Sequence, residues 1–290
     1  MPVGATMRHR SHSRSGAAMP ENLITLRAGT GPTVVFLHPA SGLATAFRRL
    51  VPYLAHGGAM LAFENPEPQC RPPSISELGA DYWEQLRMAA KDPLVLVGWS
   101  FGGVIAVELA TLAENAGRDV SAVVLLDAGS PDLLRSSRAS PLLDLGGLFG
   151  IAPSELQANA AVTSEADIVE QLVDVLRRTC DMPQIEAEDL RPFVAAYRWH
   201  HAVTRLPWVY RGHRAPVSLC RARDEHGWDD APPDLGWSVV LGVSPTLWWV
   251  PGTHHSLISE ENAPDLARLL SKLVGQGRAE ALLRADPEES

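Results

Sequence analysis

The stretch Leu94-Val-Leu-Val-Gly-Trp-Ser-Phe-Gly-Gly103 is the part of the sequence that decides the fold. Its first four residues form a short apolar run, typical of a buried strand, and a helix is predicted over 104–116. Gly117 follows that helix at the position where glycine commonly ends one. A strand, a tight turn and a helix are therefore predicted in that order.

The turn itself, Gly98-Trp-Ser-Phe-Gly102, matches the pattern G-x-S-x-G. The pattern is weak alone and gains specificity when a strand precedes it and a helix follows, as here. Such a turn forces Ser100 into strained backbone geometry, and the glycines at 98 and 102 let the neighbouring backbone pass closely. Because the hydroxyl then lies at a helix N-terminus, where negative charge is favoured, Ser100 is the predicted nucleophile.

Strands and helices alternate on both sides of this turn. The capping box Ser74-Ile-Ser-Glu77 opens a helix whose apolar stripe is Leu78, Tyr82 and Leu86. Further strands are predicted at 33–38, 59–63, 122–126, 216–220 and 246–250, and further helices at 43–54, 167–180, 190–204 and 263–273. This order predicts an α/β fold, with a mostly parallel central sheet flanked by helices.

The alternation stops between 131 and 207, where helices and loops are predicted but no strand. An all-helical insertion between two strands of such a sheet is most simply a lid over the active site. The apolar stripe Ile168, Leu172 and Leu176 is expected to line an acyl channel or to face the top of the sheet. Residues 21–280 are expected to form one catalytic domain, with loose tails at 1–20 and 281–290.

The bulk composition excludes several classes of function. The chain has 290 residues and a net charge of −9, which argues against nucleic-acid binding. No apolar run approaches the length of about 20 residues that crosses a bilayer, so no membrane partner is expected. Three cysteines, Cys70, Cys180 and Cys220, match neither a disulfide framework nor a zinc site, and reduced thiols in a cytoplasmic protein are expected. No metal and no cofactor is expected.

A serine nucleophile needs a base, and the base needs an orienting acid. In the α/β-hydrolase fold the chain order is serine, then acid, then histidine. His254, two residues after Gly252 in the loop behind the last strand, is the predicted base, and His255 is expected to point elsewhere. His38 comes too early for this order and is expected to pack at a strand end, and the pair His200-His201 lies in the lid and suits the role less.

Two carboxylates compete for the role of the acid. Asp127 directly follows the strand at 122–126, and Asp224 follows the strand at 216–220. Strand-end carboxylates line the crevice in which open α/β sheets place their sites, so both fit. Asp127 is preferred and Asp224 is the alternative.

The oxyanion of the reaction needs two N–H donors. One is predicted to be the backbone N–H of Phe101. The second should come from the loop after the first strand, His38-Pro-Ala-Ser-Gly42, and is the N–H of Ala40 or of Ser41.

Together, Gly98-Trp-Ser-Phe-Gly-Gly103, His38-Pro-Ala-Ser-Gly42, Asp127 and Gly252-Thr-His254 resemble the thioesterases of polyketide and nonribosomal peptide assembly lines. The resemblance covers residues 30 to 275. It implies an α/β-hydrolase fold with a helical lid, and a substrate held as a thioester on the phosphopantetheine of a carrier protein. In chain-terminating members the acid follows the strand after the nucleophile helix, as Asp127 does, whereas in stand-alone editing members it follows a later strand, as Asp224 does.

The resemblance predicts a thioesterase that releases or edits a carrier-bound acyl or peptidyl chain. An acyltransferase or ester-forming enzyme with the same triad is the alternative, and a binding module without turnover is disfavoured by the intact triad. The implied partners are an acyl or peptidyl carrier protein and a small acyl substrate. Carriers are usually acidic, so the docking candidates are basic residues of the lid and its exit: Arg177, Arg178, Arg205, Arg211 and Arg214.

Overall fold

A computed structural model describes residues 22–65, 74–136, 140–156, 164–180, 182–224 and 231–285. Its centre is a seven-stranded sheet with the strand order β1-β3-β2-β4-β5-β6-β7. The strands are β1 (Leu23–Arg27), β2 (Thr33–Leu37), β3 (Met60–Phe63), β4 (Leu94–Trp99), β5 (Val120–Leu126), β6 (Val217–Ala222) and β7 (Thr246–Val250). All neighbouring pairs are parallel except β1 with β3, which confirms the predicted mostly parallel sheet.

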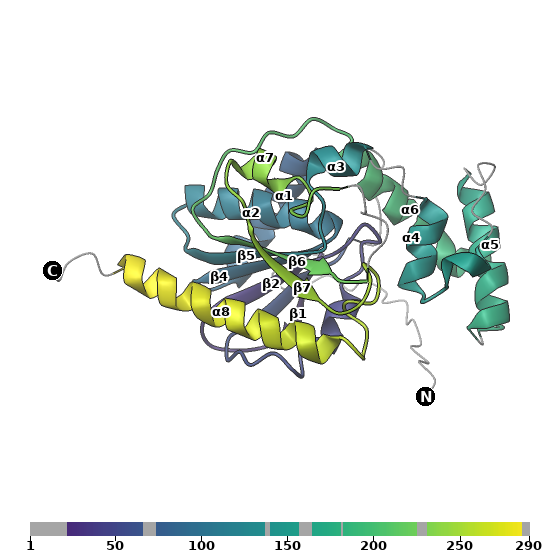
Figure 1. Cartoon of the computed structure of the whole chain (residues 1–290), viewed down its shortest axis with the longest axis horizontal. Coiled ribbons are helices and arrows are strands. Elements are labelled where there is room, and N and C mark those ends of the chain that lie inside the picture. The colour runs from purple at the N-terminus through teal and green to yellow at the C-terminus, as the bar shows by residue number, and fades with distance from the viewer. Residues whose placement is uncertain are drawn as a thin grey trace, which may run out of the picture.

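Helices cover both faces of this sheet (Figure 1). α1 (Ile75–Ala89) and α2 (Phe101–Asn115) lie on one face, and α8 (Ala263–Ala285) lies on the other. Side chains alternate between two cores along β2, where Val35 belongs to the core under α1 and α2 and Val34 to the core under α8. A strand that is buried on both sides needs a continuous apolar run, which is why the central strands were predictable from sequence.

The predicted capping box of α1 is present. The Glu77 N–H donates to the Ser74 hydroxyl at 3.1 Å, and the Ser74 N–H donates to the Glu77 carboxylate at 2.8 Å. Leu78, Tyr82 and Leu86 are buried as expected, and Gly117 has the positive φ of 76° that a helix-ending glycine adopts.

Two helix predictions were wrong in extent. Residues 43–54 contain only a five-residue 3₁₀ helix, η1 (Thr45–Arg49), and Pro52, which has no N–H, cannot extend it. Phe47, Leu50 and Leu54 are nevertheless buried, so the spacing of these apolar residues predicted the buried positions correctly. The last helix was predicted to end at 273 with a loose tail from 281, but α8 continues to Ala285. The acidic residues 286–290 and the predicted tail at 1–20 lie outside the described residues.

The described residues between β5 and β6 contain five helical segments, in agreement with the predicted helical insertion at 131–207. They are α3 (Pro131–Ser136), α4 (Pro141–Leu148), η2 (Pro153–Glu155), α5 (Glu165–Thr179) and α6 (Ala187–Thr204). α4 and α5 form a lobe beside the sheet, and α6 runs from this lobe back to the body (Figure 1). A further short helix, α7 (Trp237–Leu241), precedes β7 and was not predicted.

The stripe of α5 does not line an open channel. Ile168, Leu172 and Leu176 are at most 1% exposed, and α5 packs against α6 and α4. The wall of an accessible channel would leave its side chains partly exposed, so the expectation that this stripe lines one was wrong. The stripe is the internal core of the insertion instead.

Candidate active site

Ser100 lies at the turn between β4 and α2, as predicted. Its φ of 54° is a conformation that residues other than glycine rarely adopt. The Ser100 N–H donates to the Leu126 carbonyl at 3.0 Å, which ties the turn to the end of β5. A Cβ added to Gly98 would lie 2.2 Å from the Gly102 oxygen, and one added to Gly102 would lie 2.2 Å from the Leu37 oxygen. The pattern G-x-S-x-G is therefore imposed by backbone contact on both sides of the serine.

Asp127 and His254 form a hydrogen-bonded pair at the same edge of the sheet. Asp127 directly follows β5, has a φ of 43° and is completely buried. His254 Nδ1 donates to Asp127 Oδ2 at 2.8 Å. The other carboxylate oxygen, Oδ1, accepts a hydrogen bond from the Ala222 N–H at 3.0 Å and lies 3.4 Å from Arg221 Nε.

These contacts decide the ionisation of the carboxyl. Burial raises the pKa of Asp127, but the hydrogen bond and charge of His254, the Ala222 N–H and the Arg221 guanidinium outweigh it, so the pKa lies below its usual value. An ionised carboxylate can only accept, so it keeps the proton of His254 on Nδ1 and the lone pair on Nε2. This tautomer is the one that a general base needs.

A hydrogen bond joins the loop that carries His254 to Trp99, the residue before Ser100. Trp99 Nε1 donates to the His254 carbonyl at 3.1 Å, and the centroids of the two rings are 6.1 Å apart. Trp99 therefore links the loop that carries His254 to the turn that carries Ser100.

The alternative acid, Asp224, binds elsewhere. Asp224 Oδ2 accepts from the Gly252 N–H at 3.0 Å, and the Asp224 N–H donates to the Gly252 carbonyl at 3.0 Å. Asp224 therefore shapes the turn before His254, and Asp127 is the carboxylate on the imidazole.

His255 packs against the insertion, whereas His254 bonds Asp127. Its ring lies perpendicular to that of His254, and a Cβ added to Gly147 of α4 would lie 2.2 Å from His255 Cδ2. Burial lowers the pKa of His255 to about 3, so the ring is neutral.

The loop 38–42 passes directly beside the serine turn, since a Cβ on Gly102 would also lie 2.6 Å from the His38 oxygen. His38 Nδ1 donates to the Pro39 carbonyl at 2.8 Å, and the Tyr82 hydroxyl donates to His38 Nε2 at 2.7 Å. Burial lowers the pKa of His38 to about 4, against the Pro39 hydrogen bond. This geometry agrees with the expected packing role of His38.

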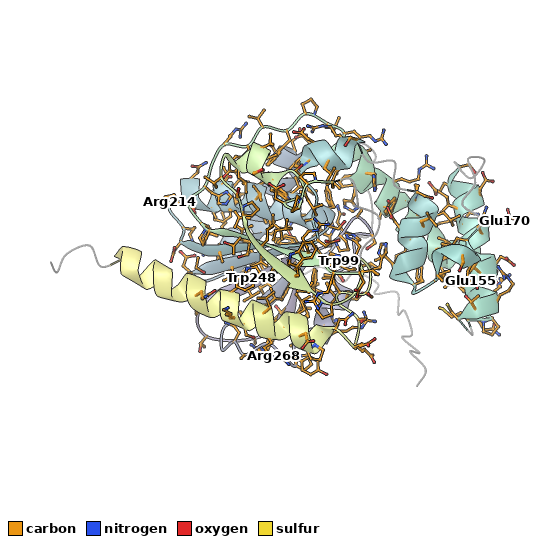
Figure 2. All side chains as sticks on the ribbon, in the orientation of Figure 1. Trp99, Glu155, Glu170, Arg214, Trp248 and Arg268 are labelled. Atoms are coloured by element: carbon orange, nitrogen blue, oxygen red, sulfur yellow. The ribbon has the colours of Figure 1, made fainter. Side chains whose placement is uncertain are left out.

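The insertion contacts both sides of the serine turn. Gly147 of α4 contacts His255, and His200 of α6 donates to the Ala40 carbonyl at 2.8 Å. Figure 2 shows Trp99 within the body, while Glu155 and Glu170 lie on the lobe formed by the insertion. Among the described residues, Gly147 and His200 thus bring the insertion to the site.

Three of the predicted docking arginines already have acidic partners. Arg177 pairs with Glu186 at 2.9 Å, Arg178 with Asp174 at 3.1 Å, and Arg214 with Glu114 at 3.3 Å. Arg205 and Arg211 are exposed.

Sequence reasoning missed Arg221, Asn65 and the contact that His200 makes. A signal for Arg221 was available, because it is a charged residue inside the strand Val217–Ala222. Asn65 had no such signal.

In the described part of the chain, no three or more His, Cys, Asp or Glu side chains gather where they could hold a metal ion. Within the same residues no helix has the length and apolarity to cross a membrane. Cys180 and Cys220 are free thiols, and Cys70 lies outside the described residues.

The parallel sheet, the serine turn and the buried Asp127–His254 pair define an α/β-hydrolase. A family model described as "Thioesterase domain" matches residues 32–274, which is most of the chain. The chain belongs to the thioesterase domain family.

Two curated relatives are multidomain synthases. The dimodular nonribosomal peptide synthase of Bacillus subtilis (strain 168) is 30% identical over 164 residues, which are 53% of this chain and 7% of that protein. The orsellinic acid synthase of Beauveria bassiana (strain ARSEF 2860) is 32% identical over 280 residues, 86% of this chain and 12% of that protein. The chain thus spans a small part of these relatives.

The same fold occurs in solved structures. A covalent complex of the NocB thioesterase domain with a fluorophosphonate nocardicin G analogue has a TM-score of 0.63 and 23% identity, covering 88% of this chain and 100% of that one. At this identity the likeness establishes the fold.

Proposed function

We propose that this protein is a serine-dependent thioesterase that releases an acyl or peptidyl chain from the phosphopantetheine of a carrier protein. The observation that carries the proposal is the Asp127–His254 hydrogen bond, because it prepares a base beside a strained serine. Membership of the thioesterase domain family and relatives that are peptide and polyketide synthases support this substrate class.

The proposed reaction has two halves. Ser100 Oγ attacks the thioester carbonyl while His254 Nε2 takes the hydroxyl proton. The oxyanion that forms is stabilised by the N–H of Phe101 and by that of Ala40 or Ser41. When the C–S bond breaks, the proton on His254 passes to the departing thiolate, and the chain remains as an ester on Ser100.

The second half frees the chain. A water molecule, or a hydroxyl or amine, attacks the ester carbonyl as His254 accepts its proton. The C–O bond to Ser100 then breaks, and the same proton returns to the serine oxygen. Water gives the acid, a nucleophile within the chain gives a ring, and a separate alcohol or amine gives acyl transfer.

The position of the acid favours a chain-terminating role over an editing role. Asp127 follows β5, the strand after the nucleophile helix, and bonds the imidazole, while Asp224 bonds the turn at Gly252. The resemblance described above associates this position with chain-terminating thioesterases.

We propose further that the insertion at 131–207 is the lid of this site. Its inner helices contact the loops on both sides of Ser100, through Gly147 and through His200. A lid of this kind shields the acyl-enzyme and can set turnover through its opening. The carrier protein would deliver its phosphopantetheine arm at the edge of this lid.

The test is to incubate the protein with a panel of acyl-pantetheine thioesters and to follow intact mass and products. We expect a transient mass increase equal to the acyl group, located on Ser100, and release of the acid or ring. Ser100→Ala should neither acquire the acyl group nor react with a fluorophosphonate probe. Acylation of Ser100→Ala at the wild-type rate would overturn the assignment, and transfer to an added alcohol in preference to water would identify an acyltransferase.

A further inference from the structure

His200 has no role in the reaction proposed above, although it is among the most buried polar residues of the insertion. It lies on α6 with no exposed surface. Its Nδ1 donates to the Ala40 carbonyl at 2.8 Å, and Asn65 Nδ2 donates to its Nε2 at 3.2 Å. The helix α6 of the insertion thus forms a hydrogen bond with the loop that carries the second proposed oxyanion donor.

The Ala40 carbonyl belongs to the same peptide unit as the Ser41 N–H. In a trans peptide these two groups point in opposite directions, and the unit is rigid. Holding the carbonyl toward His200 therefore fixes the direction of the Ser41 N–H, away from α6. His38 acts in the same way on the preceding peptide unit, since it holds the Pro39 carbonyl and so fixes the Ala40 N–H.

The donors and acceptors of this cluster match without conflict. Burial raises the pKa of Tyr82, and hydrogen bonding with the Asn65 side chain opposes that rise. Tyr82 donates to His38, and Asn65 donates to His200. Both imidazoles must then be neutral with the proton on Nδ1, and burial does hold the pKa of His200 well below its ordinary value.

His200 also contacts the first proposed donor residue. Its ring centroid is 5.0 Å from that of Phe101 and 4.7 Å from that of His38. The ring therefore fills the space between the residue after the nucleophile and the loop opposite it. A displacement of α6 would withdraw one hydrogen bond from the loop and one packing contact from Phe101.

We propose that His200 is a positioning residue: by holding the Ala40 carbonyl it fixes Ala40 between the two peptide units that carry the candidate N–H donors, so that the oxyanion site is complete only when α6 is seated. The inference rests on the proposed function, because it takes the oxyanion donors from there. It makes the lid helix part of the stabilisation of the transition state, in addition to any role in covering the substrate.

The test compares His200→Phe with His201→Phe on an acyl-pantetheine thioester. Phenylalanine keeps a ring of similar size and removes both hydrogen bonds, whereas His201 packs against Tyr197 and serves as the matched control. Loss of one oxyanion donor costs roughly 100- to 1,000-fold in kcat, and a misdirected donor should cost about 10- to 100-fold. We expect that loss in kcat for His200→Phe with little change in KM, near wild-type values for His201→Phe, and partial rescue by His200→Gln, which restores a side-chain N–H.

Two inhibitors distinguish a role of His200 in positioning the oxyanion donor from a role in packing alone. A trifluoromethyl ketone analogue of the substrate forms an oxyanion with Ser100, and a matched thioether analogue does not. His200→Phe should weaken the ketone by the same factor as kcat/KM and leave the thioether unchanged. Equal weakening of both analogues, or no loss in kcat, would overturn the positioning role.

A second measurement uses the wild-type protein, so its result does not depend on whether a variant folds. In the wild-type protein, long-range ¹H–¹⁵N spectra should show His200 as the neutral Nδ1–H tautomer at pH 7. An Nε2–H or charged ring would overturn the inference. If instead the wild-type protein forms no acyl-enzyme with any thioester while the tautomer is as expected, the proposed function fails and the inference about its oxyanion site falls with it.

Discussion

Asp127 has two oxygens with separate tasks. Oδ2 accepts from the imidazole, and Oδ1 is occupied by the Ala222 N–H and by the nearby Arg221 guanidinium. Arg221 is itself held, since its Nη1 donates to the Pro233 carbonyl at 2.9 Å. The carboxylate is thus prevented from rotating, and the proton on His254 is kept on Nδ1.

Replacing Asp127 with asparagine should slow turnover about 10,000-fold, because the amide can offer an N–H to the ring and favour the wrong tautomer. Asp224→Asn keeps an acceptor oxygen for the Gly252 N–H and should cost far less. Single-turnover acylation rates on one thioester would measure both. A larger loss at Asp224 would reverse the assignment of the acid.

The glycines at the two ends of α2 differ in what surrounds them. Gly102 has carbonyl oxygens where a Cβ would go, while Gly117 has a positive φ but nothing within 4 Å. We expect Gly117→Ala to lower the free energy of unfolding by about 1 kcal/mol, from backbone strain alone. Gly102→Ala should cost at least about 3 kcal/mol, because backbone must also move. Urea unfolding of both variants measures the two losses in the free energy of unfolding. Equal losses would contradict the prediction.

Among the elements, the insertion and the segment that leaves it hold the remaining candidates for carrier docking. Arg205 ends α6 and Arg211 follows in the connection to β6, and both are exposed. Arg178, by contrast, pairs with Asp174 one turn away on the same helix. Of the five predicted docking arginines, Arg205 and Arg211 are therefore the stronger candidates for contact with an acidic carrier.

Charge reversal of Arg205 and Arg211 should raise KM for a carrier-bound thioester several-fold and leave KM for a pantetheine thioester unchanged. Arg178→Glu is the control and should affect neither value. Parallel changes on the two substrates would show that this surface does not meet the carrier. Because surface attraction is screened, the difference should shrink as salt is raised.

Elements with a strong local signal could be predicted from sequence, and those without it could not. The central strands are apolar on both faces, so the parallel sheet and the serine turn could be read directly. β1 was missed because it is an edge strand with only Leu23 fully buried. The bond between His200 and Ala40 joins residues 160 positions apart, and no periodicity in one sequence encodes such a contact.

At the scale of the whole molecule, several imidazoles are buried in neutral form. Burial lowers the pKa of His38 to about 4 and that of His255 to about 3, and it lowers the pKa of His200 as well. The unfolded chain binds protons at these residues below about pH 6.5, and the folded chain does not until lower pH. Acid therefore favours the unfolded state.

The free energy of unfolding should be nearly constant between about pH 7 and 8 and fall as the pH drops from about 6.5 toward 4. Each of these histidines contributes a slope of up to about 1.4 kcal/mol per pH unit. Urea unfolding at pH 7.5, 6, 5 and 4.5 measures the curve. His38→Gln should be less stable at pH 7.5 and show a shallower slope, whereas a flat wild-type curve across this range would contradict the buried neutral rings.

The bond from His200 to the Ala40 carbonyl also bears on how members of this family can be recombined. The apolar stripe of α5 is buried within the insertion, which makes residues 131–207 look exchangeable as a unit. In a chimera, Asn65 and the Ala40 carbonyl would come from the host protein, whereas the imidazole that bonds both of them would come only from the protein that donates the insertion. Grafts should therefore be chosen by the residue at position 200 before the length or composition of the transplanted helices is considered.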